Sequence, residues 1–269
     1  MKNEIPVISL FVQALTLPVK HWLALLKVSS PFILCGLFAI SVYNISPSMF
    51  ISKSILISPI AIVLGLASLI TLIMAIVGCH RIFLLGPTET EQTRPFRWTG
   101  NEFRYALWWL AMTVLFAGFG MLYVFIFTSA TSLVTPLISE YQFISSIIMA
   151  LLMLPLYIVF VRVSVVLPAA AIGKANIGFG WAWNYSWNNS WRLIVLLGIL
   201  PFTMNLISDQ LPYVDSLWFN LLKGAIWLIT GVISIAALSL SFHALSELEA
   251  QREVQQNAID TEEPAQDPA

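Results

Sequence analysis

The chain has 269 residues, of which 58% are hydrophobic and 10% are charged, whereas an ordinary soluble domain has roughly 45 to 50% apolar and 25% charged residues. A soluble fold of this composition would expose large apolar patches to water, which soluble monomers rarely do. The formal net charge of −1 gives no bulk basicity, so we expect no nucleic-acid partner. The composition therefore places most of the chain in a lipid bilayer.

The first segment expected to be helical is amphipathic. Between residues 5 and 17 the polar residues Ser9, Gln13 and Thr16 recur at helical spacing and form one narrow polar stripe on an otherwise apolar surface. This pattern is typical of a helix that lies in the membrane interface. We therefore expect residues 1–20 to form an N-terminal interfacial segment, whose helix ends before Pro18.

Membrane spans are expected where charge is nearly absent over a sufficient length, because about 20 helical residues cross roughly 30 Å of hydrocarbon. Six stretches qualify, and they cover residues 28–45, 55–78, 105–128, 141–161, 193–208 and 217–241. The fifth is short and contains Pro201, which favours a kink. The sequence therefore predicts an all-α fold, a polytopic membrane helical bundle of about six transmembrane helices within residues 21–248.

The basic residues predict how this bundle is oriented. Six spans put both termini on one side of the membrane, and that side receives eleven of the thirteen Lys and Arg residues. Lys53 and Lys223 are the two on the other side. Because Lys and Arg concentrate in cytoplasmic connections, we expect both termini and the loops near 79–104 and 162–192 to be cytoplasmic.

The composition changes at the C-terminal end. Residues 249–269 are acidic, contain two prolines and lack aromatic residues. Segments with little apolar surface to bury remain disordered. The sequence therefore predicts an acidic disordered tail over 249–269.

Aromatic and basic side chains gather at the predicted cytoplasmic boundary. Trp183, Trp187 and Trp191 repeat every four residues, with Asn184, Asn188 and Asn189 expected on the other side of the helix. Such a stripe is typical of an interfacial anchor, and a ligand-stacking surface is the alternative. Four arginines stand at the ends of spans two to five: Arg81, Arg104, Arg162 and Arg192. Guanidinium groups at this depth bind lipid phosphates, or they only set topology. We take the four arginines and three tryptophans as candidate lipid or partner contacts.

The sequence carries no signature of catalysis. The central portions of the six spans contain no Asp, Glu, His or Arg, groups that proton relays and ion-coupled carriers commonly use. No nucleotide-binding, zinc-protease or serine-hydrolase motif is present, and His21, His80 and His243 lack the spacing of a metal site. We therefore predict no enzyme activity, no catalytic residue, no cofactor and no metal.

Several stretches together suggest a relationship to known proteins. They are CHRIFLLG at 79–86, LPAAAIG at 167–173, the run from Ala182 to Leu193, and SFHAL at 241–245. In these stretches the chain resembles uncharacterised proteobacterial six-helix inner-membrane proteins, which are loosely similar to the membrane domain of glycerophosphodiester phosphodiesterases or to Yip1-like proteins. Cys79 and Pro87 stand where that group has Trp and Glu. The resemblance implies a multi-pass protein of the bacterial inner membrane, without a soluble phosphodiesterase domain.

Two functions remain open from these features. The first is a non-enzymatic accessory or lipid-contacting membrane component, with membrane lipids, anionic ones included, as partners. Small residues four apart, such as Ala61 and Gly65, also permit a homo-oligomer or a membrane-complex partner. The alternative is a small transporter or exporter of an apolar or amphipathic substrate, with Pro155 and Pro201 bending helices around a cavity. A polar cavity at mid-membrane depth favours the transporter, and a filled bundle favours the accessory component.

Overall fold

A computed structural model describes residues 5–45, 59–88, 98–138, 154–174, 176–199, 203 and 217–262, and every regular element within these ranges is helical. Five of the helices are long and apolar enough to cross a membrane. They cover Trp22–Val42, Pro59–Leu85, Gly100–Leu122, Leu154–Ala171 and Leu221–Gln255. By helix length and hydropathy the chain is therefore a multi-pass membrane protein, and the predicted all-α class is confirmed.

The five helices correspond to the first, second, third, fourth and sixth expected spans. Much of the fourth expected span, residues 141–153, lies outside the described residues. Half of the fifth expected span, 193–208, lies outside them too. Its described beginning belongs to α9 (Ser190–Ile194) and to a π-helical segment, η3 (Val195–Ile199).

The first two helices are separated by one residue. α1 (Val7–Lys20) passes through Pro18, and α2 (Trp22–Ile45) begins after a turn at His21. The prediction that the first helix ends before Pro18 is wrong. Proline removes one backbone donor, but the His21 N–H still donates to the Leu17 carbonyl at 3.0 Å, so the last turn stays closed.

The long helices extend beyond the charge-free windows that predicted them. α3 (Pro59–Leu85) ends after position 78, α5 (Gly100–Ile138) begins before 105, and α11 (Leu217–Glu262) continues past 241. The predicted disorder is therefore wrong for residues 249–262, which are helical. Glu, Gln, Arg and Ala in this segment are good helix formers, and a helix that has already nucleated extends at little cost.

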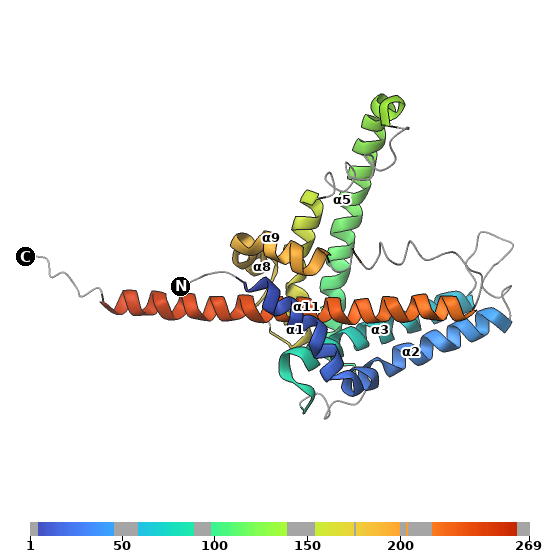
Figure 1. The fold of residues 1–269 in the computed structure, drawn as a ribbon, viewed down its shortest axis with the longest axis horizontal. Helices are drawn as coiled ribbons and strands as arrows, with labels where there is room; N and C mark the ends of the chain where they lie inside the picture. Colours follow the sequence, from blue (N-terminus) through green and yellow to red (C-terminus); the bar gives the residue numbers. More distant parts are fainter. Residues whose placement is uncertain are drawn as a thin grey trace, which may run out of the picture.

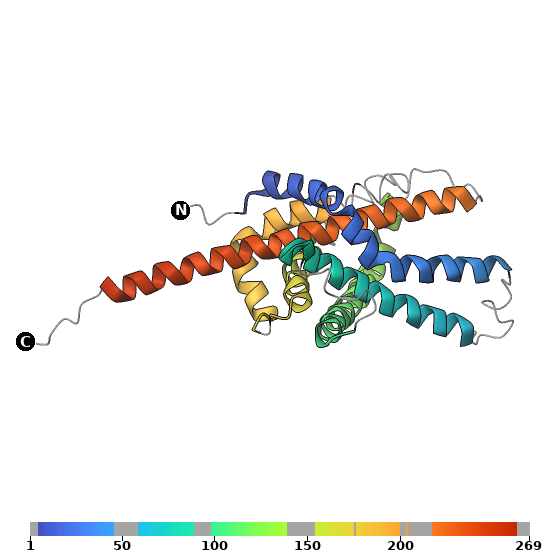
Figure 2. The same ribbon diagram turned by 90° about the horizontal axis from the view of Figure 1, so that it is seen from below.

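Figures 1 and 2 show how the helices are arranged. α11 runs through the molecule with α1 and α3 beside it, α2 pairs with α3, and α5 rises away from this layer next to α7 (Val166–Ala171). The C-terminal part of α11 projects alone (Figure 1). A buried core lies where α1, α7, α9 and α11 meet, and it includes Leu10, Leu193 and Phe242. α2, α3 and α5 expose apolar side chains, among them Phe38, Val63 and Val114, as expected of surfaces that contact a membrane.

Candidate functional site at the junction of the helices

A short amphipathic segment carries the three predicted tryptophans. α8 (Phe179–Ser186), η2 (Trp187–Asn189) and α9 follow one another without a break. Trp183, Trp187 and Trp191 are all exposed, and Trp187 is 62% exposed. We refer to these three side chains as the aromatic face. The opposite side of the segment is buried and consists of Ala182, Ser186, Asn189 and Leu193.

The asparagines of this segment do not share one side. Asn184 and Asn188 are exposed, whereas Asn189 is completely buried on the side opposite the aromatic face, so the prediction that all three lie together on one side is wrong. At 100° per residue Asn189 falls on the side of Ser186 rather than of Asn188. Its Oδ1 accepts hydrogen bonds from the Ile5 N–H and from Arg192 Nη1, both at 3.1 Å. Asn189 of η2 therefore joins the residues just before α1 to α9.

Arg162 lies directly behind the aromatic face. Its Nε donates to Ser186 Oγ at 3.0 Å, and its Nη2 donates to the Trp183 carbonyl. The guanidinium carbon lies 3.6 Å from the ring centroid of Trp183 and 4.6 Å from that of Trp187. Arg162 is only 3% exposed, and no carboxylate of the described residues pairs with it. The two indole faces and the protein oxygens therefore take the place of a counter-ion.

Arg81 forms a separate network at the end of α3. Its Nη1 pairs with Glu102 Oε1 at 3.0 Å, and its Nε donates to the Ala171 carbonyl at 2.9 Å. Glu102 Oε2 also accepts the Thr99 N–H at 2.7 Å, which is the capping-box arrangement at the start of α5. Arg81 thus joins α3, α5 and α7.

The other two candidate arginines have different partners. Arg104 Nη1 donates to the Gly173 carbonyl at 3.4 Å. The Arg192 guanidinium lies 4.8 Å from the Trp191 ring centroid, at the edge of the aromatic face. The structure therefore gathers Arg162, Arg192 and the three tryptophans in one region, while Arg81 and Arg104 hold α7 and the residues after it.

Glu102 and His80 are among the buried polar side chains that were not predicted as site residues. Glu102 had a detectable signal, because Thr99 and Glu102 have capping-box spacing. His80 had none, since it is a single histidine at the end of an apolar run. Its Nδ1 lies 2.7 Å from Ser239 Oγ, and that hydroxyl donates to the Ile235 carbonyl at 2.8 Å. Because the hydroxyl hydrogen is donated to that carbonyl, His80 donates through Nδ1, and its buried Nε2 has no hydrogen-bond partner among the described residues.

The extension of α11 beyond position 241 is held by α8. Trp181 Nε1 donates to Glu249 Oε1 at 2.7 Å, and the Arg252 guanidinium lies 5.8 Å from the Tyr185 ring centroid. Burial, and then the charge of Glu249, raise the pKa of the Tyr185 phenol. These contacts explain why the acidic sequence begins as helix rather than as a disordered tail.

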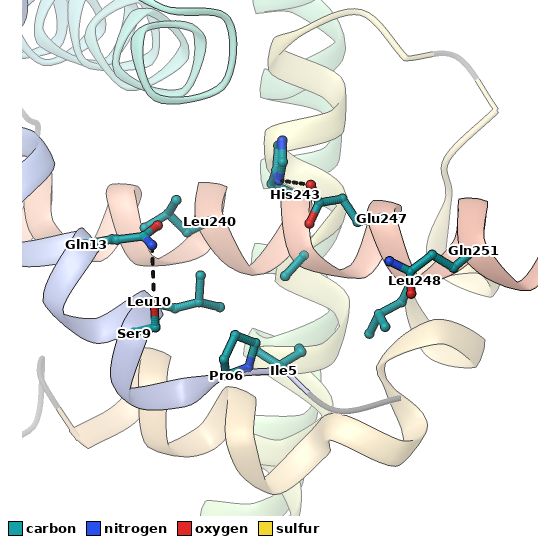
Figure 3. Close-up of a pocket in the computed structure, with 11 residues that line it drawn as sticks. Ile5, Pro6, Ser9, Leu10, Gln13, Leu240, His243, Glu247, Leu248 and Gln251 are labelled. Atoms are coloured by element: carbon teal, nitrogen blue, oxygen red, sulfur yellow. Dashed lines mark hydrogen bonds and ion pairs between the residues drawn. The ribbon is translucent and has the colours of Figure 1, made fainter. Parts of the chain in front are cut away.

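A cavity of about 350 Å³ opens between α1 and α11 (Figure 3). Its apolar lining residues are Ile5, Pro6, Leu10, Leu240, Ala244 and Leu248, and its polar ones are Ser9, Gln13, His243, Glu247 and Gln251. Gln13 Nε2 donates to Ser9 Oγ at 3.3 Å on α1, and His243 Nδ1 lies 3.5 Å from Glu247 Oε1 on α11. The cavity is therefore amphipathic, with both helices contributing polar and apolar groups.

Comparison with known proteins adds nothing to the assignment of the chain as a multi-pass membrane protein. No protein family model, curated protein or solved structure matches the chain. Within the ranges that the structure describes, no three His, Cys, Asp or Glu side chains are placed to hold a metal ion. The functional proposals for this multi-pass membrane protein rest on its own residues and contacts.

Proposed function

We propose that the protein is a non-enzymatic accessory component of the bacterial inner membrane that contacts lipids through the aromatic face. The observation that carries this proposal is the row of three exposed indoles backed by the Arg162 guanidinium. Both termini are cytoplasmic in this proposal, because of the distribution of Lys and Arg. The aromatic face then lies at the level of the cytoplasmic headgroups.

The chemistry of indole supports a lipid contact. Tryptophan has an apolar ring body and one N–H donor, and it concentrates at membrane interfaces for that reason. Asn184 and Asn188, exposed on the same segment, supply amides suited to headgroups and water. Stacking on Arg162 restrains Trp183 and Trp187, so little side-chain entropy is lost when lipid packs against them.

The arginines differ in how their guanidinium groups are placed. Arg81 has its charge paired with Glu102, and Arg162 is buried against protein groups, so both hold the junction together. Arg192 donates to Asn189 Oδ1, but it is half-buried and lies against Trp191 at the edge of the aromatic face. We assign to Arg192 the contact with the phosphate of an anionic lipid, to which guanidinium donates charge-assisted hydrogen bonds.

Native mass spectrometry of the full chain tests this function. The protein is extracted gently from membranes that contain phosphatidylglycerol, and the retained lipid is counted. Arg192→Gln should lower phosphatidylglycerol retention about threefold, because an exposed charge pair contributes up to about 1 kcal/mol. Replacing Trp187 and Trp191 together by Ala should lower it further.

The matched control is Trp227→Ala on α11, because Trp227 is an exposed indole. Trp227 precedes Glu249, the residue that contacts α8, by about 33 Å along the helix. This variant should leave phosphatidylglycerol retention unchanged. If the Trp187 and Trp191 double variant keeps as much phosphatidylglycerol as the parent, the aromatic face is not the lipid contact and the proposed function fails.

A further inference from the structure

We propose that the cavity between α1 and α11 binds the primary ammonium group of an amphipathic amine, with the ammonium at Glu247 and the attached apolar chain against Leu10 and Leu240. This cavity is separate from the aromatic face. It also gives a role to the polar stripe of α1, because Ser9 and Gln13 line it.

The charge of the lining selects a cation. Glu247 is the carboxylate among the eleven lining residues, and no Lys or Arg is among them. His243 Nδ1, on the preceding turn of α11, lies 3.5 Å from Glu247 Oε1. The lining therefore offers a carboxylate and neither Lys nor Arg, which favours an ammonium group and disfavours an isolated phosphate.

The hydrogen-bonding groups of the lining select a primary ammonium. Carboxylate, amide and hydroxyl oxygens are acceptors, and Glu247, Gln13, Gln251 and Ser9 provide them. An –NH₃⁺ group has three N–H donors and pairs with several of these oxygens at once. A trimethylammonium group has no N–H donor, so the cavity should discriminate against choline headgroups.

The position of the cavity makes it reachable from lipid. Ser9 and Gln13 border a face of α1 that exposes Ile8, Val12 and Val19, which is the kind of apolar stripe that enters the boundary between headgroups and acyl chains. The volume of about 350 Å³ accommodates a headgroup and the first part of a chain. The amine is then either the headgroup of phosphatidylethanolamine or a free alkylamine.

Native mass spectrometry of the full chain in a nonionic detergent tests the cavity. Phosphatidylethanolamine, phosphatidylcholine and phosphatidylglycerol with identical acyl chains are offered in equal amounts, and dodecylamine is offered separately. We expect phosphatidylethanolamine to be retained about threefold over phosphatidylcholine, in line with a partly exposed charge pair. Glu247→Gln should abolish this preference without unfolding the protein, because the Glu247 side chain is 63% exposed.

Glu253→Gln is the matched control, since Glu253 is an exposed carboxylate on the same helix outside the cavity. It should keep the preference for phosphatidylethanolamine. Binding of dodecylamine that depends on Glu247, without a preference for phosphatidylethanolamine, supports the site with a free amine as the ligand. The proposal is overturned if Glu247→Gln retains every amine as well as the parent does, or if the parent shows neither a preference for phosphatidylethanolamine nor binding of dodecylamine.

Discussion

Among single residues, Arg162 makes several contacts at once that only a planar guanidinium group can make together. It makes two hydrogen bonds and two ring contacts from a buried position. Arg162→Lys keeps the charge but loses the planar fork that makes these contacts together. We expect a loss of about 2 kcal/mol in the free energy of unfolding, because hydrogen bonds to charged groups contribute about 1.5 to 3 kcal/mol each. Thermal unfolding in one detergent measures this loss.

Arg104→Lys is the matched control for that measurement. Arg104 makes one long hydrogen bond, to the Gly173 carbonyl at 3.4 Å, so its replacement should lower the unfolding temperature much less. Equal unfolding temperatures for the parent and Arg162→Lys would show that the stack on Trp183 and Trp187 contributes nothing to stability.

The buried pair of His80 and Ser239 gives a second prediction at this scale. Ser239→Ala removes the partner of His80 Nδ1 and leaves a buried donor unpaired, which costs about 1 to 3 kcal/mol. Ser234→Ala on the same helix removes only a hydroxyl bonded to the Thr230 carbonyl and should change stability little. Unfolding curves of the two variants should therefore separate, and coincident curves would contradict the role assigned to Ser239.

At the scale of elements, the packing of α2 on α3 depends on Gly78. A Cβ atom at Gly78 would overlap Val28 Cγ1, whereas one at Gly65 on the same helix meets no atom of the described residues within 4 Å. Gly78→Ala should destabilise the protein by about 1 to 3 kcal/mol through overpacking. Gly65→Ala should be neutral or slightly stabilising, because Ala is the better helix former. Adding Val28→Ala to Gly78→Ala should restore stability, and a failure of this rescue in thermal unfolding would contradict the close contact.

The positions of the long helices were predictable from the sequence, but their ends were not. Charge-free windows located five of the long helices because the hydrocarbon thickness fixes their length. The helix ends were missed where contacts outside the hydrocarbon extend a helix, as Trp181 does for Glu249. Pro18 was taken as a stop, although the helix around it retains its other hydrogen bonds. A charge-free stretch of sequence does not indicate such contacts, so the ends of these helices could not be predicted from it.

The candidate site was only partly predictable for the same reason. The spacing of Trp183, Trp187 and Trp191 predicted one stripe, and the three side chains are exposed on one segment. The partners of Arg81 and Arg162 come from other helices, so no local pattern indicates them. Only the capping-box spacing of Thr99 and Glu102 pointed to part of one network.

At the scale of the whole molecule, the distribution of Lys and Arg predicts that both termini face the cytoplasm. A green fluorescent protein fused after residue 269 should therefore fluoresce, and alkaline phosphatase at the same place should be inactive. Alkaline phosphatase inserted near Lys53 should be active, because that connection is expected outside. The reverse pattern of reporter activities would contradict the predicted orientation.

We expect the aromatic face to lie in lipid. The full chain is placed in nanodiscs whose lipids carry bromine either near the headgroup or near the end of the acyl chain. The emission lost on replacing Trp183, Trp187 and Trp191 together by Phe isolates the signal of these three indoles among the ten tryptophans. We predict that bromine near the headgroup quenches this signal more strongly than bromine near the chain end. A signal that neither bromine position quenches would place the three indoles away from lipid and contradict this expectation.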